Sequence, residues 1–451
     1  MEYNPCPRMI GNTLQIGLAG LGTVGTGVFE TLNRNHDILE ARAQISYAVR
    51  RIAVRDATRP RDTDVPRELL TEDWHDLTND PDIDIIIELI GGTNEAYHLI
   101  KAALEAGKPV VTGNKALLAR HGGELFRLSR SKGTPLYFEA SVGGGIPIVQ
   151  SLQHSLVCNR VQSVAGILNG TSNYVLTSMQ QKGISFAEAL KRAQEKGYAE
   201  ADPSFDVNGW DAAHKALVLA MLAYGTLPPS ECMTVSGIEN VEAEDFRFAD
   251  MLGYTIKLMA IIRHHAAYGQ EPECLELRVQ ASLVPKEHML AHVNGVFNAI
   301  AVRGDVVGET IFYGRGAGRQ PTASAVIADV VLAMRECKLQ GYHTGFLPYT
   351  KDIPVMPIQE TETPCYVRFL VQDRPGVIAC VSAAFAERGV GISAINSTTG
   401  SEDRFGVRWN HLVIMLHSCK WGDLRAAIAE CTKRSFIHPY PVVLRIENFT
   451  N

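Results

Sequence analysis

The sequence of 451 residues has no long apolar run and no leader-like N-terminus. No apolar run approaches the roughly 18 residues that a helix needs to cross a bilayer. The first twelve residues, MEYNPCPRMIGN, contain no basic start followed by an apolar stretch, so they do not resemble a secretory signal. These two absences predict a cytoplasmic protein that does not associate with membranes.

Paired cysteines and an excess of positive charge are also missing. The nine cysteines are scattered and form no C-x-x-C pair, which predicts reduced thiols, no zinc site and no disulfide framework. The net charge of -6, from 43 basic and 49 acidic residues, gives no indication of nucleic-acid binding. What remains is an ordinary globular composition with 46% apolar residues, long enough for about three domains of roughly 150 residues.

Strands and helices alternate over the first 140 residues. Leu14, Ile16 and Leu18 alternate as in a strand, a glycine-rich turn follows, and Val24 and Val28 then recur at helical spacing. Such alternation is typical of a parallel sheet in a Rossmann-type nucleotide domain. Further strands are predicted over 45–54, 83–90, 109–112 and 135–139, and further helices over 94–106 and 122–132.

The remaining chain divides into a mixed α+β part, a linker and a small C-terminal domain. The mixed part covers 141–305 and is followed by a segment, about 306–340, that completes the nucleotide domain of 1–140. Four prolines between 348 and 364 predict a linker over 341–363. Residues 364–451 follow the order βαββαβ of a ferredoxin-like fold. Within the middle part, a strand is predicted over 161–168 and helices over 173–182, 185–196 and 208–224.

The turn Gly20-x-Gly22-x-x-Gly25 is the first motif that carries chemistry. Glycines allow a tight turn and a close approach of the backbone to a pyrophosphate, and the following helix offers free N–H groups to it. Because the turn lies between a predicted strand and a predicted helix, it has the context that a dinucleotide site requires. The next strand ends in Arg55-Asp56, where an acid would favour NAD and an arginine would favour NADP. The presence of Arg55 favours NADP as the predicted cofactor.

Two further motifs follow predicted strands of this domain. Lys115 comes after the strand 109–112, at the edge where open α/β sheets bind their ligands. Glu139 begins the stretch EASVGGGIP, whose backbone oxygens suit a hard cation. Spacing alone favours the simpler interpretation of that stretch, a chain crossover that needs glycines.

The segment 197–224 is the most informative part of the sequence. Asp211 and Lys215 lie four residues apart on a predicted helix that is otherwise almost entirely apolar. Burial lowers the pKa of a lysine and a nearby carboxylate raises it again, which can make the lysine a usable proton donor. The alternative is an ordinary helical salt bridge. His214 lies off this face and is interpreted as structural.

Two later turns leave two interpretations each. A second glycine-rich turn at 313–318 precedes a predicted helix over 322–334. In one interpretation this helix returns to the nucleotide domain and the turn contacts the cofactor. In the other, the turn is an ordinary helix start without a ligand. In the C-terminal domain, the turn from Asp373 to Gly376 and Val377 opens a helix whose amides could hold an amino-acid carboxylate. The alternative is a dimerisation module without a ligand.

Taken together, the motifs resemble the monofunctional homoserine dehydrogenase family with a C-terminal ACT domain. The resemblance extends over about 13–446. It rests on GLGTVG at 20–25, ELIGG at 88–92, TGNKA at 112–116, EASVGGGIPI at 139–148, GILNGTSN at 166–173 and GYAEADP at 197–203 with Asp211 and Lys215.

The resemblance implies the reversible reduction of L-aspartate 4-semialdehyde to L-homoserine by NADPH or NADH, in threonine, methionine and isoleucine biosynthesis. It implies that Lys215 donates and accepts the proton, that Lys115 lies between cofactor and substrate, and that Glu200 and Asp211 bind homoserine. Residues 141–305 would form the catalytic and dimerisation domain. The implied cofactor-binding residues are Gly20, Leu21, Gly22, Thr23, Val24, Gly25, Arg55, Thr93, Lys115, Gly197 and Gly316.

The resemblance also implies two further ligands and an assembly. A sodium ion is expected at Glu139, Val142, Gly144 and Ile146, held largely through carbonyl oxygens. Threonine is the expected effector of the ACT domain, with Asp373, Gly376 and Val377 as candidate contacts. The chain is expected to form a homodimer or homotetramer. The alternatives are another Rossmann oxidoreductase acting on an amino-acid semialdehyde or imine, and a nucleotide-binding regulator without activity.

Overall fold

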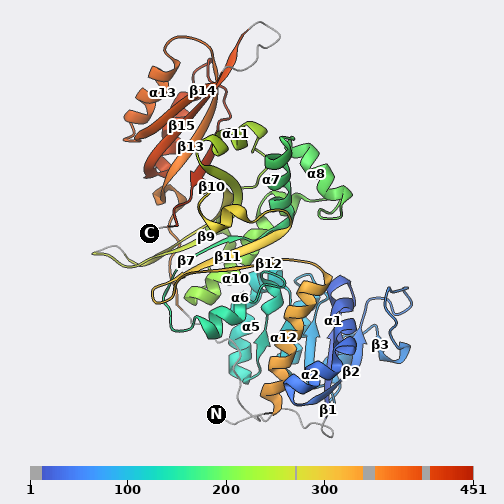
Figure 1. Cartoon of the computed structure of the whole chain (residues 1–451). Coiled ribbons are helices and arrows are strands. Elements are labelled where there is room, and N and C mark those ends of the chain that lie inside the picture. The colour runs from blue at the N-terminus through green and yellow to red at the C-terminus, as the bar shows by residue number, and fades with distance from the viewer. Residues whose placement is uncertain (1–12, 270–271, 339–350, 399–406, 450–451) are drawn as a thin grey trace. The chain divides into compact units, whose positions relative to one another are not determined.

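The computed structural model describes residues 13–269, 272–338, 351–398 and 407–449. The chain forms two compact units, each assembled from separated segments (Figure 1). The first unit contains Met1–Val161, His214–Ser230 and Asn298–Asp352, and the second contains Gln162–Ala213, Glu231–Phe297 and Ile353–Asn451. The four-part division expected from the sequence is a finer description and stays a prediction. None of the helices in these described ranges is long and apolar enough to cross a membrane.

The first unit is built on a six-stranded parallel sheet with the order β3-β2-β1-β4-β5-β6. This is the order of a doubly wound dinucleotide-binding sheet, which confirms the predicted Rossmann-type domain. Each central strand is buried on both faces, as its continuous apolar run predicts. The strands are β1 (Thr13–Ala19), β2 (Ser46–Ala53), β3 (Leu70–Thr71), β4 (Ile85–Glu88), β5 (Val110–Thr112) and β6 (Leu136–Tyr137).

Helices cover this sheet, and one of them comes from much later in the chain. The helix α12 (Arg319–Lys338) packs beside α1, and Ala323, Val326 and Val330 join the core under β1 and β4 (Figure 1). The helix after the second glycine-rich turn therefore returns to the nucleotide domain. The other helices of this domain are α1 (Thr23–Arg34), α2 (His36–Ala43), α3 (His75–Asn79), α4 (Glu95–Glu105) and α5 (Lys115–Lys132).

The start of α5 corrects one sequence prediction. The helix begins at Lys115 and not at Gly122, because the side chain of Asn114 caps it by accepting a hydrogen bond from the Leu117 amide. Gly122 and Gly123 suggested a boundary but lie inside the helix. The unit also contains the 3₁₀ turn η2 (Glu139–Ser141), the short helix α6 (Ile148–Gln150) and the neighbouring strands β11 (Phe297–Gly304) and β12 (Gly308–Arg315).

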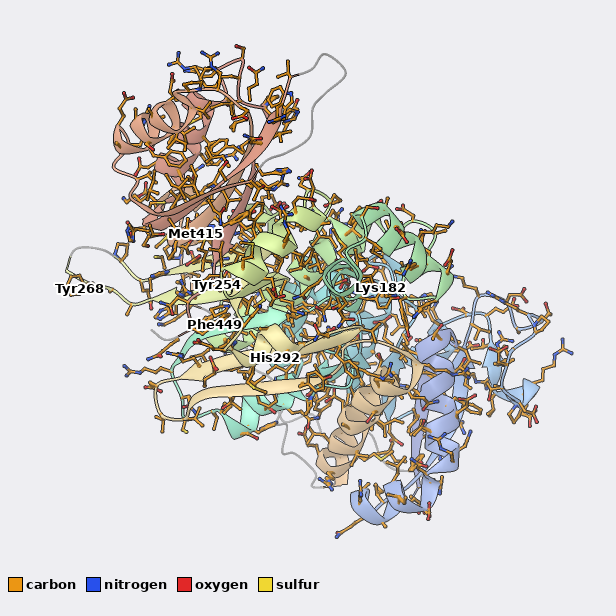
Figure 2. The ribbon with its side chains drawn as sticks, turned by 45° about the horizontal axis from the view of Figure 1, so that its top comes forward. Lys182, Tyr254, Tyr268, His292, Met415 and Phe449 are labelled. Atoms are coloured by element: carbon orange, nitrogen blue, oxygen red, sulfur yellow. The ribbon has the colours of Figure 1, made fainter. Side chains whose placement is uncertain are left out.

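The second unit contains one sheet with the order β7-β9-β10-β16-β13-β15-β14. Its longest pair is β9 (Tyr254–His265) with β10 (Cys274–Pro285), which are antiparallel over their whole length. Tyr268 lies in the hairpin between them and points away from the sheet, with 85% of its surface exposed (Figure 2). The other elements here are β7 (Val161–Ile167), α7 (Gly170–Lys182), α8 (Phe186–Glu195), α9 (Ser204–Val207), β8 (Thr234–Val235) and α11 (Ala243–Met251). The helix α10 (Trp210–Tyr224) begins in the second unit and belongs to the first unit from His214 on.

The C-terminal part has the predicted βαββαβ order and joins this sheet directly. Its last strand β16 pairs in parallel with β10, with Ser282 opposite Arg445 and Leu283 opposite Ile446. The first part of the predicted linker, 341–350, lies outside the described residues, and β13 already begins at Glu362. The elements are β13 (Glu362–Gln372), α13 (Val377–Ala386), β14 (Ile392–Thr398), β15 (Trp409–Lys420), α14 (Trp421–Cys431) and β16 (Val442–Ile446).

Candidate active site

The glycine turn between β1 and α1 requires its glycines for steric reasons. Gly20 has φ +96°, and a Cβ there would lie 2.5 Å from the Leu89 carbonyl oxygen. A Cβ on Gly25 would lie 2.0 Å from the Gly20 carbonyl oxygen. Gly22 is the N-cap residue of α1. The backbone amides of the first turn of α1 have no partner within the helix, and they point to the space above the glycine turn. The sequence motif therefore forms the anion-binding turn that its spacing predicts.

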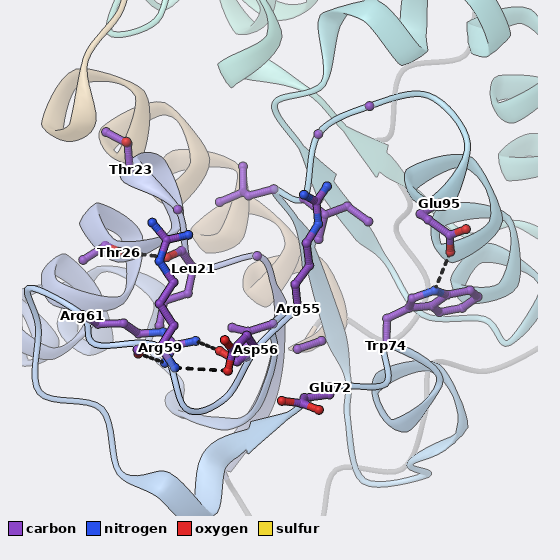
Figure 3. A pocket seen from close by; sticks show the side chains of 18 of the residues that line it. Leu21, Thr23, Thr26, Arg55, Asp56, Arg59, Arg61, Glu72, Trp74 and Glu95 are labelled. Carbon is purple, nitrogen blue, oxygen red and sulfur yellow. Dashed lines mark hydrogen bonds between the residues drawn. The ribbon is translucent and has the colours of Figure 1, made fainter.

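A pocket of about 880 Å³ opens above this turn (Figure 3). Its wall includes Trp74, whose indole N–H donates to Glu95 over 3.1 Å, and Arg319 at the start of α12. The volume is suitable for a ligand with the size of a dinucleotide. Six of the predicted cofactor residues line the pocket, namely Gly20, Leu21, Gly22, Thr23, Arg55 and Thr93.

Arg55 and Asp56 differ in how they are engaged. The Asp56 carboxylate accepts hydrogen bonds from the amide and hydroxyl of Thr58, at 2.8 and 2.6 Å, and from the Arg59 amide. These bonds hold the pKa of Asp56 below its ordinary value. Arg55 is exposed and reaches into the pocket in Figure 3. In the described part of the chain, the side chains of Arg55 and Arg59 form no hydrogen bond or ion pair with protein groups, and both residues line the pocket.

Glu88 supports the loop of the pocket wall, a role that its sequence motif did not reveal. It is fully buried at the end of β4, and its carboxylate accepts hydrogen bonds from the Thr112 hydroxyl at 2.6 Å and from the amides of Ile90 and Gly91. Burial raises its pKa, and these hydrogen bonds oppose the rise. The carboxylate thereby shapes the turn that leads to Thr93 in the pocket wall. The available signal was an acid that follows three consecutive isoleucines, Ile85 to Ile87, in the apolar segment 83–90.

Lys115 is the first residue of α5 and is partly exposed. The neighbouring Asn114 donates from its amide nitrogen to the Gly92 carbonyl oxygen at 2.7 Å. This bond ties the start of α5 to the loop that contributes Gly92 and Thr93 to the pocket. Lys115 is therefore positioned beside the pocket, at the carboxyl edge of the sheet.

The two glycine-rich loops of the sequence meet in the first unit. The Gly145 amide donates to the Arg315 carbonyl oxygen at 3.0 Å. Gly144 has φ +54°, and a Cβ there would lie 2.5 Å from the carbonyl carbon of Gly316. The candidate cation loop and the second candidate cofactor loop therefore form one close-packed junction.

The side chain of Glu139 is already engaged within the protein. Its carboxylate accepts hydrogen bonds from the amides of Val149 and Gln150, at 3.0 and 2.7 Å. Burial raises the pKa of Glu139 to about 7. Because the carboxylate is engaged, only the main-chain oxygens of this loop would be available to a cation, and the sodium site stays a prediction. No cluster of three or more His, Cys, Asp or Glu side chains fit for a metal occurs in the described ranges.

In the second unit, Asp211 belongs to a small polar cluster at the start of α10. The Asn169 side-chain nitrogen donates to the carboxylates of Asp211 and Asp206, at 2.8 Å in both cases. Asp211 is only 6% exposed. Glu200 and Gly197 lie in the loop after α8, where Glu200 is exposed and its carbonyl oxygen accepts from Gln194. The structure therefore pairs Asp211 with Asp206, a residue that the sequence analysis did not select.

Lys215 lies on α10, one helical turn after Asp211, and is only 8% exposed. The residues around it on the helix, Ala212, Ala213, Ala216 and Leu217, are all fully buried. The predicted combination of an amine with a dry environment is thus present. In the C-terminal part, Gly376 has φ +89° and precedes α13, Asp373 is exposed, and the Val377 side chain lies in the core.

A doubly wound sheet with an anion-binding glycine turn, together with a buried lysine on an apolar helix, defines an NAD(P)-dependent oxidoreductase. Comparison with known proteins gives the family. The family model for homoserine dehydrogenase matches residues 147–331, and the model for the homoserine dehydrogenase NAD-binding domain matches residues 20–139. Both fall on the parts described above.

Full-length relatives agree with these models. The homoserine dehydrogenase of Synechocystis sp. is 41% identical over 444 residues, covering 96% of this chain and 99% of that protein. The one from Pseudomonas aeruginosa is 42% identical over 394 residues, covering 86% and 89%. The crystal structure of a homoserine dehydrogenase from Thiobacillus denitrificans superimposes with a TM-score of 0.87 at 37% identity, covering 97% of this chain and 99% of that one. The chain belongs to the homoserine dehydrogenase family.

Proposed function

We propose that this chain interconverts L-homoserine and L-aspartate 4-semialdehyde with NADP(H), and that Lys215 is the proton donor and acceptor. The observation that carries the proposal is the buried amine of Lys215, one turn from the substrate-binding candidate Asp211 on an apolar helix. Family membership supports the substrate pair. The same geometry favours an enzyme over a nucleotide-binding regulator, which has no use for a buried lysine and acid at this place.

When bound, the nicotinamide supplies and accepts the hydride at the carbonyl carbon. Reduction of an aldehyde places negative charge on its oxygen, and the Lys215 ammonium meets that charge by giving a proton to the oxygen. In the opposite direction the neutral amine takes the proton of the homoserine hydroxyl. The apolar neighbours of Lys215 exclude water, which strengthens the interaction between the ammonium and the oxygen.

The carboxylates of Asp211 and Glu200 are the proposed partners of the homoserine end of the substrate. A carboxylate binds the substrate ammonium group through charge-assisted hydrogen bonds. Asp211 is the better fixed of the two, since Asn169 holds its carboxylate. Lys115, at the start of α5 beside the pocket, is proposed to lie between cofactor and substrate.

The preference for NADP over NAD is proposed from Arg55 and Arg59. Both line the pocket without protein partners in the described part of the chain, whereas the Asp56 carboxylate is engaged by its own loop. A guanidinium suits the 2′-phosphate that distinguishes NADP, and a carboxylate that is free to bind the 2′-hydroxyl would favour NAD. A hyperthermophilic archaeal homoserine dehydrogenase, 25% identical with a TM-score of 0.59, has been solved in complex with NADPH.

Three finer proposals complete the function. Sodium is proposed to bind the main-chain oxygens of Glu139, Val142, Gly144 and Ile146, where it would brace the junction with Gly316. Threonine is proposed as an inhibitor that binds at the turn before α13, whose first amides follow Gly376. The βαββαβ order supports an ACT-type regulatory domain. The assembly is proposed to be a homodimer or homotetramer.

The central test is the variant Lys215→Met, with the exposed Lys191→Met on α8 as the matched control. We expect kcat for homoserine oxidation to fall about 10²–10⁴-fold, because the proton acceptor is lost. Binding of NADP⁺, measured by fluorescence titration, should remain within twofold in both variants. Turnover within about threefold of the wild type would contradict the role of Lys215.

The finer proposals are tested on the full-length wild type by steady-state kinetics. We expect a higher kcat/KM with NADP⁺ than with NAD⁺, and inhibition by millimolar threonine. Replacing sodium by choline should lower the rate if the loop holds a cation. Equal kcat/KM values for the two cofactors, no response to threonine or no response to sodium would each remove the corresponding proposal, and none of these results would affect Lys215.

A further inference from the structure

The N-terminus of α7 contacts two neighbouring acids, Asp206 and the proposed substrate-binding residue Asp211. Asn169 caps this helix and is only 4% exposed. Its side-chain oxygen accepts a hydrogen bond from the Ser172 amide at 2.7 Å, while its nitrogen donates to Asp206 and Asp211, at 2.8 Å each. The Ser172 amide can only donate, so the oxygen of the Asn169 amide must face it. The orientation of the Asn169 side chain is therefore fixed by its own helix.

This orientation places a neutral N–H donor between two carboxylates. Asp206 and Asp211 would repel each other if nothing lay between them, because like charges a few ångströms apart disfavour joint ionisation. Each of the two hydrogens on the Asn169 nitrogen is directed to one carboxylate. The bridge separates the two carboxylates and fixes where the Asp211 oxygens lie.

The same turn holds the loop that carries Glu200. The Thr171 hydroxyl donates to the Tyr198 carbonyl oxygen at 2.7 Å, and the Ser172 hydroxyl donates to the Asp206 carbonyl oxygen at 2.8 Å. The loop 197–206 is thus fastened at both ends to the start of α7. Asn169 is the member of this turn that touches the carboxylates themselves.

We infer that Asn169 is a positioning residue, which sets the Asp211 carboxylate for the homoserine ammonium through its side-chain amide. The inference rests on the proposed function, in which Asp211 binds the substrate. Asn169 acts through Asp211 and has no contact of its own with the reacting atoms in this scheme. A substitution at this position should therefore lower kcat/KM for homoserine and leave the affinity for NADP⁺ unchanged.

The variants Asn169→Ser and Asn169→Asp test this, because serine and aspartate both cap helices as well as asparagine does. Serine retains the cap but cannot donate to two carboxylates, and we expect kcat/KM for homoserine to fall about 10–100-fold. Aspartate retains the cap and adds a third negative charge, so the fall at pH 9 should be larger. The KM for NADP⁺ should stay close to the wild type in both variants.

The pH dependence of Asn169→Asp separates positioning from a structural defect. The new carboxyl lies next to two acids, which raises its pKa, and in its protonated form it regains one donor. The ratio of kcat/KM in this variant to that of the wild type should therefore rise by at least fivefold when the pH is lowered from 9 to 6. The ratio does not depend on how much of the variant is folded, provided that the folded fraction is constant over this range. A ratio that does not change with pH would contradict the role of the hydrogen bonds from Asn169 to Asp206 and Asp211.

Two further variants complete the design. Ser185→Ala removes the cap of α8 in the same unit, and kcat/KM should stay within twofold of the wild type. Asp211→Asn tests the proposed function itself. If Asp211→Asn retains wild-type kcat/KM, the role of Asp211 is wrong and the inference falls with it. If Asp211→Asn is impaired while both Asn169 variants stay within twofold, only the inference about Asn169 is wrong.

Discussion

Arginine is used in opposite ways in the two compact units. In the nucleotide pocket, Arg55 and Arg59 are exposed, and their side chains have no protein partner in the described part of the chain. In the second unit, Arg278 is fully buried, and Arg368 is 4% exposed, each surrounded by carboxylates. The side chain is the same in both places, so its role depends on whether its negatively charged partner is a carboxylate of the protein or a ligand. An arginine without a protein partner at a pocket indicates an anionic ligand, whereas a neutralised one joins parts of the chain.

The buried arginines connect the C-terminal strands to the rest of their unit. Arg278 on β10 donates two bonds to Glu447 after β16, at 2.6 and 2.8 Å, and one to Glu276 at 2.7 Å. Arg368 on β13 donates to Asp245 on α11 at 2.6 and 3.0 Å. Such bidentate pairs require a defined geometry. They therefore fix β13 and β16 against the elements that they contact.

The largest effect is expected when one buried partner is removed. Arg278→Met leaves Glu276 and Glu447 buried without their main counter-charge, and we expect the free energy of unfolding to fall by about 3–5 kcal/mol. The exposed Arg434→Met on the C-terminal surface should change it by less than about 0.5 kcal/mol. Denaturant unfolding of both variants measures this. Similar small losses in the two would mean that the buried network does not stabilise the fold.

The same network predicts how stability responds to acid. Burial alone would raise the pKa of Glu447, but the charge of Arg278 outweighs it and leaves the pKa below its ordinary value. A lowered carboxyl pKa in the folded state contributes stability above the unfolded pKa, and this contribution is lost as the pH falls through the folded value. The wild type should therefore lose more stability than Arg278→Met when the pH is lowered from 5 to 3.

Lys257 differs from the buried arginines, because its hydrogen-bond partners in the described part of the chain are neutral oxygens and not carboxylates. Its ammonium donates to the Val293 carbonyl oxygen at 2.6 Å and to the side chains of Asn294 and Asn173, at 3.0 and 3.5 Å. Burial lowers its pKa to about 8. Between this value and the ordinary value near 10.5, the unfolded chain binds a proton that the folded chain does not.

Stability should consequently rise with pH over this window in the wild type. Relative to Lys257→Met, we expect a gain of up to about 3 kcal/mol between pH 8 and 10.5, which follows from about 1.4 kcal/mol per unit of pKa. Urea unfolding at a series of pH values measures the slope. Parallel curves for the two proteins would show that Lys257 keeps its proton in the folded state.

The smallest effect in free energy is expected at the pocket, where it appears as specificity and not as stability. Arg55→Ala should lower kcat/KM for NADP⁺ about 10–100-fold, corresponding to about 1.4–2.7 kcal/mol, because the partner of the 2′-phosphate is lost. The value for NAD⁺ should stay within twofold. Arg67→Ala, which removes an exposed arginine outside the pocket, serves as the control. An equal loss with both cofactors would contradict the assignment of Arg55 to the 2′-phosphate.

The nucleotide domain was predictable because its signals are local. Each strand, glycine turn and helix follows the previous one within a few residues, and Gly20, Gly22 and Gly25 define the turn without help from the rest of the chain. The strands β9 and β10 were missed for two different reasons. Eight consecutive residues of β9 are buried, and its sequence shows little alternation of apolar and polar residues. The sequence of β10 does alternate, with Glu276, Arg278 and Gln280 between apolar residues, so its strand signal was present, but the burial of both its faces could not be read from that pattern.

The site was predictable only in part for a related reason. Asp211 and Lys215 are one helical turn apart, so their common face can be inferred from spacing alone. The bond from Asn169 to Asp211 joins residues 42 positions apart, and the bond from Arg278 to Glu447 joins residues 169 positions apart. No periodicity in a single sequence records such pairs. Glu88 was visible as an acid in an apolar run, but its partners were not.

The pairing of β16 with β10 has a consequence for any attempt to shorten this protein. Removing the last hundred residues would leave Ser282 and Leu283 of β10 without their strand partners on that side and would take away the Glu447 partner of Arg278. A bare edge of this kind pairs readily with the edges of other molecules. A truncated chain would then be prone to aggregate, and a loss of activity in it would say little about regulation. Point substitutions at the turn before α13 test the proposed threonine site without removing β16.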